Sequence, residues 1–514
     1  MIRKVLGYWP LVFLLLATFV LRIYKIDELF YFTYDESVPA FVARKLIIFK
    51  DISLLGGVTP FGFHLGPYFY WFLALILFFG KLDPIAWGWA SAGVAMVTTF
   101  MFFLVGKLMV DKKTGFIAAS IWTFSFLANV YDRHLWALYW GPLVCLVVIF
   151  SLYKIIKKKE NYIYLLAFIL AFAIHADLSN LVFLFVSFLV LRAYRIFSIK
   201  KMAIVAGIII LSFTPLVIFD LRHQFSNTRP VLGFFNQYGK RSTITGAKIK
   251  ENLQIFPYAL TRLIYSYSDN EVSKQYSYCS QYVKEKYNSI PKYAVFMSSI
   301  FLAGFLLFSF RRKSNDTFIS LISITVITYI LGIQMYGSIF GADIFEHYIS
   351  GVFPAMILAI AYIFSKLPKP LWVVALSIYI YINLSKLSAA QDLIGFVNKR
   401  QAINFTMSEI SNIPFSLDSL STCWKYSGYR YLFAVFGREP VKSYVDPNLA
   451  YLYGTTKVGT EHPKTVVSFV VHDFVPETAD FYQRYAILKS HGIKSQLFGN
   501  IEVIILDNST NWFK

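Results

Sequence analysis

Two adjacent carboxylates, Asp35 and Glu36, follow the first apolar segment of the chain by about ten residues. A carboxylate in such a place can accept a proton from a reacting hydroxyl group, as a general base. Glu36 could also orient Asp35, bind a substrate or help to hold a divalent cation of unknown identity. Structural alternatives stay open, because Asp35 could cap the helical pattern at residues 38–49 and Glu36 would suit its first turn.

Further ionisable residues gather at the ends of other apolar segments. Ionisable groups at such places need partners and often mark a substrate path. Arginine and histidine can also grip an anion through charge-assisted hydrogen bonds. In each case the alternative is an ion pair, an anchor or a cap that joins helix ends. The candidates are His64, Asp132, Arg133, His134, His175, Asp177, Arg222, His223, Glu346 and His347.

The composition requires lipid as the solvent of the chain. Of its 514 residues, 57% are hydrophobic and only 15% are charged, which leaves more apolar surface than a soluble core of this size can hide. The net charge of +20 arises from short basic clusters between apolar runs, as beside anionic lipid headgroups, and this excludes nucleic acid as a partner. The three cysteines lack metal-ligand spacing, and whether Cys279 and Cys423 pair stays open.

Eleven apolar segments have the length of membrane spans. A twelfth, residues 66–80, is short and aromatic, and we expect it to be juxtamembrane or re-entrant. With that choice the basic loops lie on the side of Arg3 and Lys4, as the positive-inside rule requires, and all eight histidines lie on or beside the outer face. The expected spans are 8–24, 84–106, 114–130, 135–153, 161–175, 178–194, 202–219, 292–310, 317–335, 349–365 and 370–386.

The domain organisation follows from this topology. Residues 1–386 form an all-α polytopic membrane domain with a cytoplasmic N-terminus in the plasma membrane and two long outer loops, 25–65 and 221–291. Residues 387–514 are too polar to span and form a soluble extracytoplasmic domain. Within it, residues 465–474 and 501–508 have the pattern of strands and 477–490 that of a helix, which predicts a small α/β module.

The order of these motifs resembles a known family. An Asp35-Glu36 pair in the first outer loop, the run from His64 to Trp71, many spans and a soluble tail together resemble polyprenyl-phosphate-sugar glycosyltransferases of the GT-C fold. Protein O-mannosyltransferases and aminoarabinose transferases look similar. The family run commonly reads Lys or His, Pro-Pro-Leu, Tyr, and here it reads His64-Leu65-Gly66-Pro67-Tyr68. Asp132-Arg133-His134, Asp220 to His223 with Asn227 to Arg229, and Glu346-His347-Tyr348 extend the resemblance over residues 8–365.

The resemblance implies a transferase that moves a monosaccharide from a polyprenyl phosphate to a lipid, glycan or protein acceptor at the outer face. Asp35 would be the base of an inverting reaction and Arg222 a cation that stabilises the departing phosphate. No cofactor beyond the divalent cation already considered is implied. A flippase or other transporter is the alternative, although its charged groups should lie near the bilayer midplane. A sensor or scaffold is a third reading and would tolerate substitution of Asp35.

Overall fold

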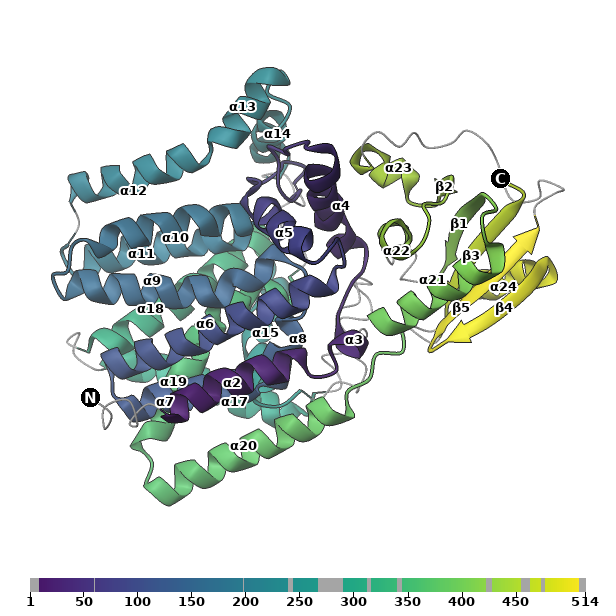
Figure 1. Ribbon diagram of the computed structural model, residues 1–514. Helices are drawn as coiled ribbons and strands as arrows, with labels where there is room; N and C mark the ends of the chain where they lie inside the picture. Colours follow the sequence, from purple (N-terminus) through teal and green to yellow (C-terminus); the bar gives the residue numbers. More distant parts are fainter. Residues whose placement is uncertain are drawn as a thin grey trace.

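The computed structural model describes most of the chain and shows a bundle of nearly parallel helices joined at one end to a smaller domain built on a sheet (Figure 1). Cys145 is a buried free thiol inside the bundle. Cys279 and Cys423, the pair left open above, lie outside the described residues. The described residues are 9–59, 61–196, 198–238, 244–266, 290–311, 316–339, 344–421, 428–453, 463–472 and 477–507.

The bundle is made of apolar helices, and each of the eleven expected spans coincides with one helix or with two consecutive ones. They are α2 (Trp9–Ile23), α6 (Ile85–Met109), α7 (Lys112–Phe124) with α8 (Phe126–Tyr131), η1 (Ala137–Trp140) with α9 (Gly141–Ile156), α10 (Tyr162–Ala176), η2 (Leu178–Leu181) with α11 (Val182–Ala193), α12 (Ile199–Ser212) with α13 (Thr214–Arg222), α17 (Lys292–Arg311), α18 (Thr317–Gln334), η5 (Glu346–Val352) with α19 (Phe353–Lys366), and α20 (Lys369–Ala389).

Length and apolarity together qualify six of these segments, in the described part of the chain, to cross a membrane. The pair α12 and α13, which is bent by 46°, would make a seventh if it forms one span. The segments of α2, of α10 and of η2 with α11 are apolar but shorter. The chain is therefore an integral membrane protein, and the count of eleven spans stays a prediction.

The helices differ in how deeply they lie in the bundle. In the apolar stretch of η5 and α19, 78% of the residues are buried. The corresponding shares are 11% in α17 and 22% in α20, so these two helices have surface for lipid. Helices α6 and α7 are in close backbone contact at Gly106 and Gly115, where a Cβ atom on either glycine would collide with the backbone of the other helix. Small residues at such crossings let membrane helices pack by van der Waals contact.

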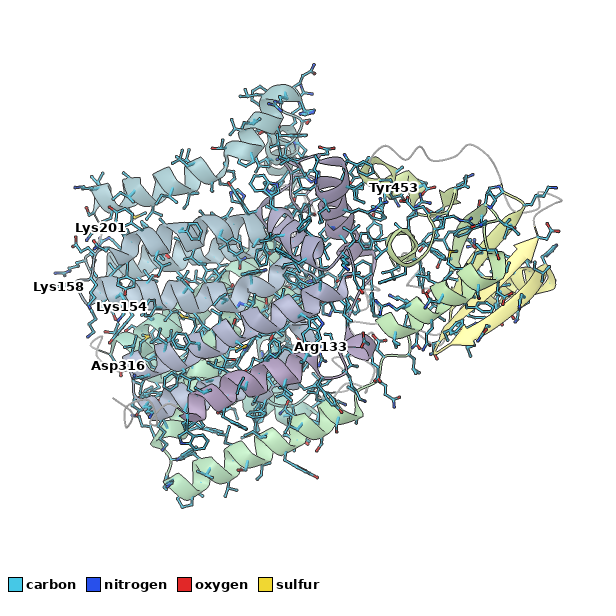
Figure 2. The ribbon with its side chains drawn as sticks, viewed as in Figure 1. Arg133, Lys154, Lys158, Lys201, Asp316 and Tyr453 are labelled. Atoms are coloured by element: carbon cyan, nitrogen blue, oxygen red, sulfur yellow. The ribbon has the colours of Figure 1, made fainter. Side chains whose placement is uncertain are left out.

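The two ends of the bundle carry different side chains. Lys154, Lys158 and Lys201 lie at one end, and Arg133 lies toward the other end, which adjoins the sheet domain (Figure 2). The basic loops and the C-terminal domain are therefore at opposite ends of the bundle.

Each of the two long loops predicted from the sequence contains helices. The first holds α3 (Ile26–Leu29) and α4 (Tyr34–Phe49), and residues 66–80 form the apolar helix α5 (Tyr68–Phe79). The described part of the second holds α14 (Thr228–Tyr238) and α15 (Gly246–Ile264). One face of α15, including Phe256 and Leu260, is buried in the core of the bundle. This part of the expected loop is thus an integral part of the membrane domain.

The C-terminal domain is built on a five-stranded sheet with the order β2-β1-β3-β5-β4, in which β1 is parallel to β2 and β3 and the other pairs are antiparallel. The strands and helix expected at residues 465–474, 501–508 and 477–490 are confirmed as β3, β5 and α24. The elements are α21 (Phe396–Ile410), β1 (Phe415–Leu420), α22 (Tyr429–Phe436), β2 (Lys442–Ser443), α23 (Asp446–Leu449), η6 (Ala450–Leu452), β3 (Thr465–Val471), α24 (Ala479–Ser490), β4 (Gly492–Phe498) and β5 (Ile501–Asp507).

Alternation along the strands gives the sheet two apolar faces. Val466, Val470 and Ile504 pack with Phe481 and Leu488 of α24 on one face. Residues of opposite parity join the larger core, which includes α21, α22 and the bundle. Helix α21 therefore lies between the sheet and the membrane domain, next to α3 (Figure 1).

Candidate active site

The acidic pair begins helix α4. Thr33 is the N-cap, so Asp35 and Glu36 occupy the second and third helical positions. Glu36 Oε2 accepts hydrogen bonds from the Thr33 backbone N–H at 2.8 Å and from the Thr33 hydroxyl at 2.6 Å, as in a capping box. The alternative in which Asp35 is the N-cap is therefore wrong, because the helix starts four residues earlier than its apolar pattern indicated.

The helix gives the two neighbouring carboxylates different surroundings, since consecutive residues point about 100° apart. Glu36 is 0% exposed, whereas Asp35 is partly exposed. The charge of Asp35 acts on the phenol groups of Tyr31, Tyr70 and Tyr348, which come from three separate segments. Of the two acidic residues, Asp35 is therefore the one that is accessible from outside the protein.

His134 contacts Glu36 from the second predicted outer loop. Its Nδ1 lies 3.4 Å from Glu36 Oε1, and both side chains are fully buried. The imidazole packs on Tyr31 with ring centroids 3.9 Å apart, and the His134 carbonyl accepts the indole N–H of Trp87 at 2.5 Å. Three predicted site residues, Asp35, Glu36 and His134, thus meet at one end of the bundle.

Asp132 and Arg133 take part in hydrogen bonds that connect the C-terminal ends of α2 and α7. Arg22 of α2 donates to Asp132 at 3.0 Å and also to the carbonyls of Trp122 and Thr123, at the C-terminal end of α7. Arg133 in turn donates to three carbonyl oxygens at the C-terminal end of α2, those of residues 21, 22 and 24. Each arginine therefore satisfies carbonyl groups that a helix end leaves without partners.

A buried ion pair holds the segment around Glu346. Its two carboxylate oxygens accept hydrogen bonds, one from the Tyr131 hydroxyl at 2.6 Å and the other from Arg262 Nη1 at 2.5 Å. These three residues come from η5, α8 and α15, so the pair braces η5 against two other helices. Arg262 was not among the candidates from the sequence, because the apolar pattern did not reveal that its part of the predicted outer loop is a buried helix.

Aromatic rings line the region between His134 and Tyr348. Trp136 contacts His134 at 6.2 Å and His347 at 4.9 Å between ring centroids, and His347 contacts Tyr348 at 4.6 Å. The charge of Asp177 also acts on Tyr348, as that of Asp35 does. Asp177 Oδ1 in addition accepts the backbone N–H of Ser179 at 2.7 Å, which caps η2. His347 and Asp177 thus border the same region as Asp35.

His175 joins the starts and ends of three helices. Its Nδ1 accepts the backbone N–H of Gly66 at 3.1 Å, so the ring proton is on Nε2, which lies 2.9 Å from the Ser212 hydroxyl. Tyr68 donates to the Ser212 carbonyl at 2.6 Å. A Cβ atom at Gly66 would overlap the His175 ring, which gives a physical reason for glycine at this position.

His64 is bound to the α13–α14 corner mainly through its backbone. Its N–H donates to Asn227 Oδ1 at 2.6 Å, and its carbonyl accepts from the Asn227 amide at 3.2 Å. Its ring Nδ1 lies 3.0 Å from the Gly56 carbonyl. Arg222 and His223 on the same corner are exposed, and the His223 ring stacks on Phe219 with centroids 4.1 Å apart.

A divalent cation is not accommodated by the groups around Glu36. Within the described ranges no three His, Cys, Asp or Glu side chains are arranged to hold a metal ion. One Glu36 oxygen takes two hydrogen bonds from Thr33 and the other faces His134. The residues present therefore do not form a metal centre around Glu36.

Two solved structures of one protein share this architecture. ArnT from Cupriavidus metallidurans bound to undecaprenyl phosphate has a TM-score of 0.57 and 10% sequence identity, over 96% of this chain and 97% of that chain. Its apo form has a TM-score of 0.56 at 10% identity, over 98% of both chains. The Archaeoglobus fulgidus oligosaccharyltransferase in complex with zinc and sulfate has a TM-score of 0.45 and 13% identity, over 89% of this chain and 67% of that chain.

Sequence comparison adds nothing to this likeness, because no protein-family model and no curated protein sequence matches the chain. At 10% identity the agreement with ArnT extends over nearly the whole length of both chains, so it concerns the order and packing of the helices and the attached sheet domain. The protein therefore has the GT-C fold.

Proposed function

We propose that this chain is an integral membrane glycosyltransferase that moves a monosaccharide from a polyprenyl phosphate to a hydroxyl-bearing acceptor at the outer face of the membrane. One observation carries the proposal. Asp35 is a partly exposed carboxylate on a helical turn that buried Glu36 and His134 hold in place. A base that must meet a substrate needs both the exposure and the rigid support.

Asp35 acts as the general base in this reaction. It takes the proton of the acceptor hydroxyl while the hydroxyl oxygen forms a bond to the anomeric carbon of the donor sugar. The bond from that carbon to the phosphate oxygen breaks on the opposite side, and its electron pair leaves with the polyprenyl phosphate. The configuration at the anomeric carbon is inverted. General-base assistance of this kind contributes roughly 10²- to 10⁴-fold to a rate.

The departing phosphate needs positive charge or hydrogen-bond donors. Arg222 is exposed at the C-terminal end of α13, where its guanidinium can meet a lipid phosphate, and the neighbouring His223 is exposed too. Arg262 has a structural role instead of binding the phosphate, because it forms an ion pair with Glu346. That pair holds η5, and with it His347 and Tyr348, beside Asp35.

A lipid donor suits both the fold and the location. The ArnT structure with the same fold was solved with undecaprenyl phosphate bound. A transferase that works outside the cytoplasm has no nucleotide sugar at hand and must use a sugar on a membrane lipid. The acceptor is a lipid, a glycan or a protein that presents a hydroxyl group to Asp35.

The proposed orientation places the N-terminus in the cytoplasm and the C-terminal domain outside the plasma membrane. Support comes from Lys154, Lys158 and Lys201 at the end of the bundle that is remote from that domain (Figure 2). Single cysteines at Ser53 and Lys158, in a variant without the three native cysteines, test it. Ser53 should react with an impermeant maleimide from outside and Lys158 only after lysis, and the reverse pattern would overturn the orientation.

The transfer itself can be measured with the purified full-length protein in lipid nanodiscs. A panel of radiolabelled polyprenyl-phosphate sugars is offered together with acceptors extracted from host membranes, and NMR gives the anomeric configuration of the product. Transfer with inversion supports the proposal, and transfer with retention removes the single-displacement mechanism. If no donor is consumed, lipid-linked sugar should be followed across vesicle membranes, because translocation without bond cleavage would identify a flippase instead.

A further inference from the structure

The C-terminal domain touches the chain immediately before the acidic pair. Lys399 of α21 is 2% exposed, and its Nζ donates a hydrogen bond to the Phe32 carbonyl at 2.5 Å. Phe32 directly precedes Thr33, the N-cap of α4, whose N–H and hydroxyl are bound by Glu36. One side chain of the C-terminal domain therefore binds the carbonyl of the same peptide unit whose N–H, that of Thr33, is bound by Glu36.

Other parts of the domain press against the same segment, residues 28–33. Phe396 packs edge to face on Phe30 and Phe32, with centroids 5.4 and 6.3 Å away. Gly428 has a φ of +74°, and a Cβ atom there would come within 2.8 Å of the Thr33 carbonyl oxygen. Because this contact requires the absence of a side chain, the backbones of the two domains are in direct contact at the start of α4.

Helix α4 is also held along its length. The ring of Phe41 packs against Tyr431 and Tyr453, each at 5.1 Å between centroids. One turn later, Arg44 forms an ion pair with Glu439. The C-terminal domain thus contacts α4 at its start and in its middle, through aromatic rings and one ion pair.

The ammonium group of Lys399 is buried and is compensated by nearby groups. Burial lowers the pKa of Lys399 to about 8, although Asp392 and Glu36 act in the opposite direction. The ring of Tyr429, 5.7 Å from Nζ, adds a cation–π contact. A buried ammonium is expensive unless it is well compensated, and here one of the two compensating carboxylates is Glu36 itself.

We propose that Lys399 is a positioning residue of the active site, which fixes the Phe32 carbonyl and the charge of Glu36 so that Asp35 faces the acceptor hydroxyl. The inference rests on the proposed function, since it assigns Asp35 the role of base. According to this proposal, the C-terminal domain is part of the structure that supports the catalytic site. The first turn of α4 has the reactive geometry only when this domain is packed against it.

The test compares full-length wild type, Lys399→Met and Lys494→Met in lipid nanodiscs. Lys494, on the outer strand β4, is a matched control, because it is an exposed lysine of the same domain and pairs with Glu409 of α21. Lys399→Met should raise the hydrogen-exchange rate of the amides of residues 33–37 and lower kcat by about tenfold or more, with KM for the donor nearly unchanged. Lys494→Met should change neither quantity.

Gly428→Ala is a second variant that disturbs the same segment without removing any charge. If Lys399→Met does not fold, this variant tests whether contact with the C-terminal domain orders the first turn of α4. It should raise exchange in residues 33–37 as well. Wild-type exchange in both variants would overturn the inference, as would raised exchange with an unchanged kcat. Failure of the proposed function looks different, because wild type would then transfer no sugar while the exchange comparison could still be made.

Discussion

The start of α4 and the corner between α13 and α14 both carry charged residues next to each other in the sequence, yet they are built differently. Glu36 is 0% exposed and is bound by Thr33 and by His134 from a separate loop. Arg222 and His223 are exposed, and the contacts described for His223 are with Phe219 of its own helix. The first region holds its charges in a defined geometry, and the second offers them to solvent or lipid headgroups.

Because of this difference, substitutions in the two regions should have effects of different size. Removing a buried group leaves its partners without hydrogen bonds in a place that water cannot enter, so both geometry and stability suffer. Removing an exposed cation takes away one attraction and leaves the fold as it was. The acidic turn should therefore respond to single substitutions far more strongly than the corner.

Glu36→Ala is expected to have the largest effect among the supporting residues. It removes the acceptor of two Thr33 hydrogen bonds and the partner of His134, so the unfolding free energy should fall by about 1–3 kcal/mol and kcat by more than tenfold. Thermal melting in detergent and the transfer assay measure the two effects. A variant with wild-type melting and turnover would contradict this expectation, because the buried turn would then be no more sensitive than the exposed corner.

Gly66→Ala should destabilise the protein by about 1–3 kcal/mol, because the new methyl group overlaps the His175 ring. The steric cause predicts non-additivity, since His175→Ala makes room for that methyl group. The double variant should therefore be more stable than the sum of the two single losses indicates. Strict additivity in thermal melting would show that the close contact between Gly66 and His175 is not what requires glycine.

The pH dependence of stability should differ between wild type and Lys399→Met. The pKa of Lys399 is about 8 in the folded protein, lowered by burial, and its ordinary value is 10.5. Between these values the unfolded chain binds the proton and the folded protein does not, so this group makes stability rise with pH. The melting temperature of wild type relative to the variant should therefore increase from pH 7.5 to pH 9.5, and a flat or falling difference would contradict the burial of the ammonium.

Arg222→Gln should have the smallest effect. The side chain is exposed, so melting should not change, while KM for the polyprenyl-phosphate donor should rise by a few-fold to about tenfold with a smaller change in kcat. The increase should shrink at high ionic strength, because exposed charges are screened. An unchanged KM at low salt would remove Arg222 from donor binding and leave the corner without a role in the reaction.

The features that follow from local pattern could be predicted from the sequence. Apolar runs located the helices of the bundle, and runs of apolar, β-branched residues located β3 and β5. The helix expected after the carboxylate pair is present as α4, although it already begins at Tyr34. These features depend on periodicity and composition, which residues within one segment already express.

The features that depend on contacts between distant segments could not be predicted. Arg262 lies in a stretch that reads as a polar loop, and its burial against Glu346 requires the tertiary packing of α15. Lys399 is one lysine in a polar tail, and nothing near it in the sequence shows that it reaches the Phe32 carbonyl. The start of α4 was placed too late, because the capping residues Thr33 and Glu36 are polar and carry no apolar period.

The assignment of Asp35 as the base is tested most directly by Asp35→Asn beside the control Asp51→Asn, an exposed aspartate just beyond the other end of α4. Both proteins are assayed in nanodiscs for transfer of labelled sugar, with thermal melting as a check on folding. Asp35→Asn should lose about 10²- to 10⁴-fold in kcat at unchanged melting temperature, because asparagine keeps the size and removes the proton acceptor. Asp51→Asn should behave as wild type, and wild-type turnover by Asp35→Asn would contradict the account.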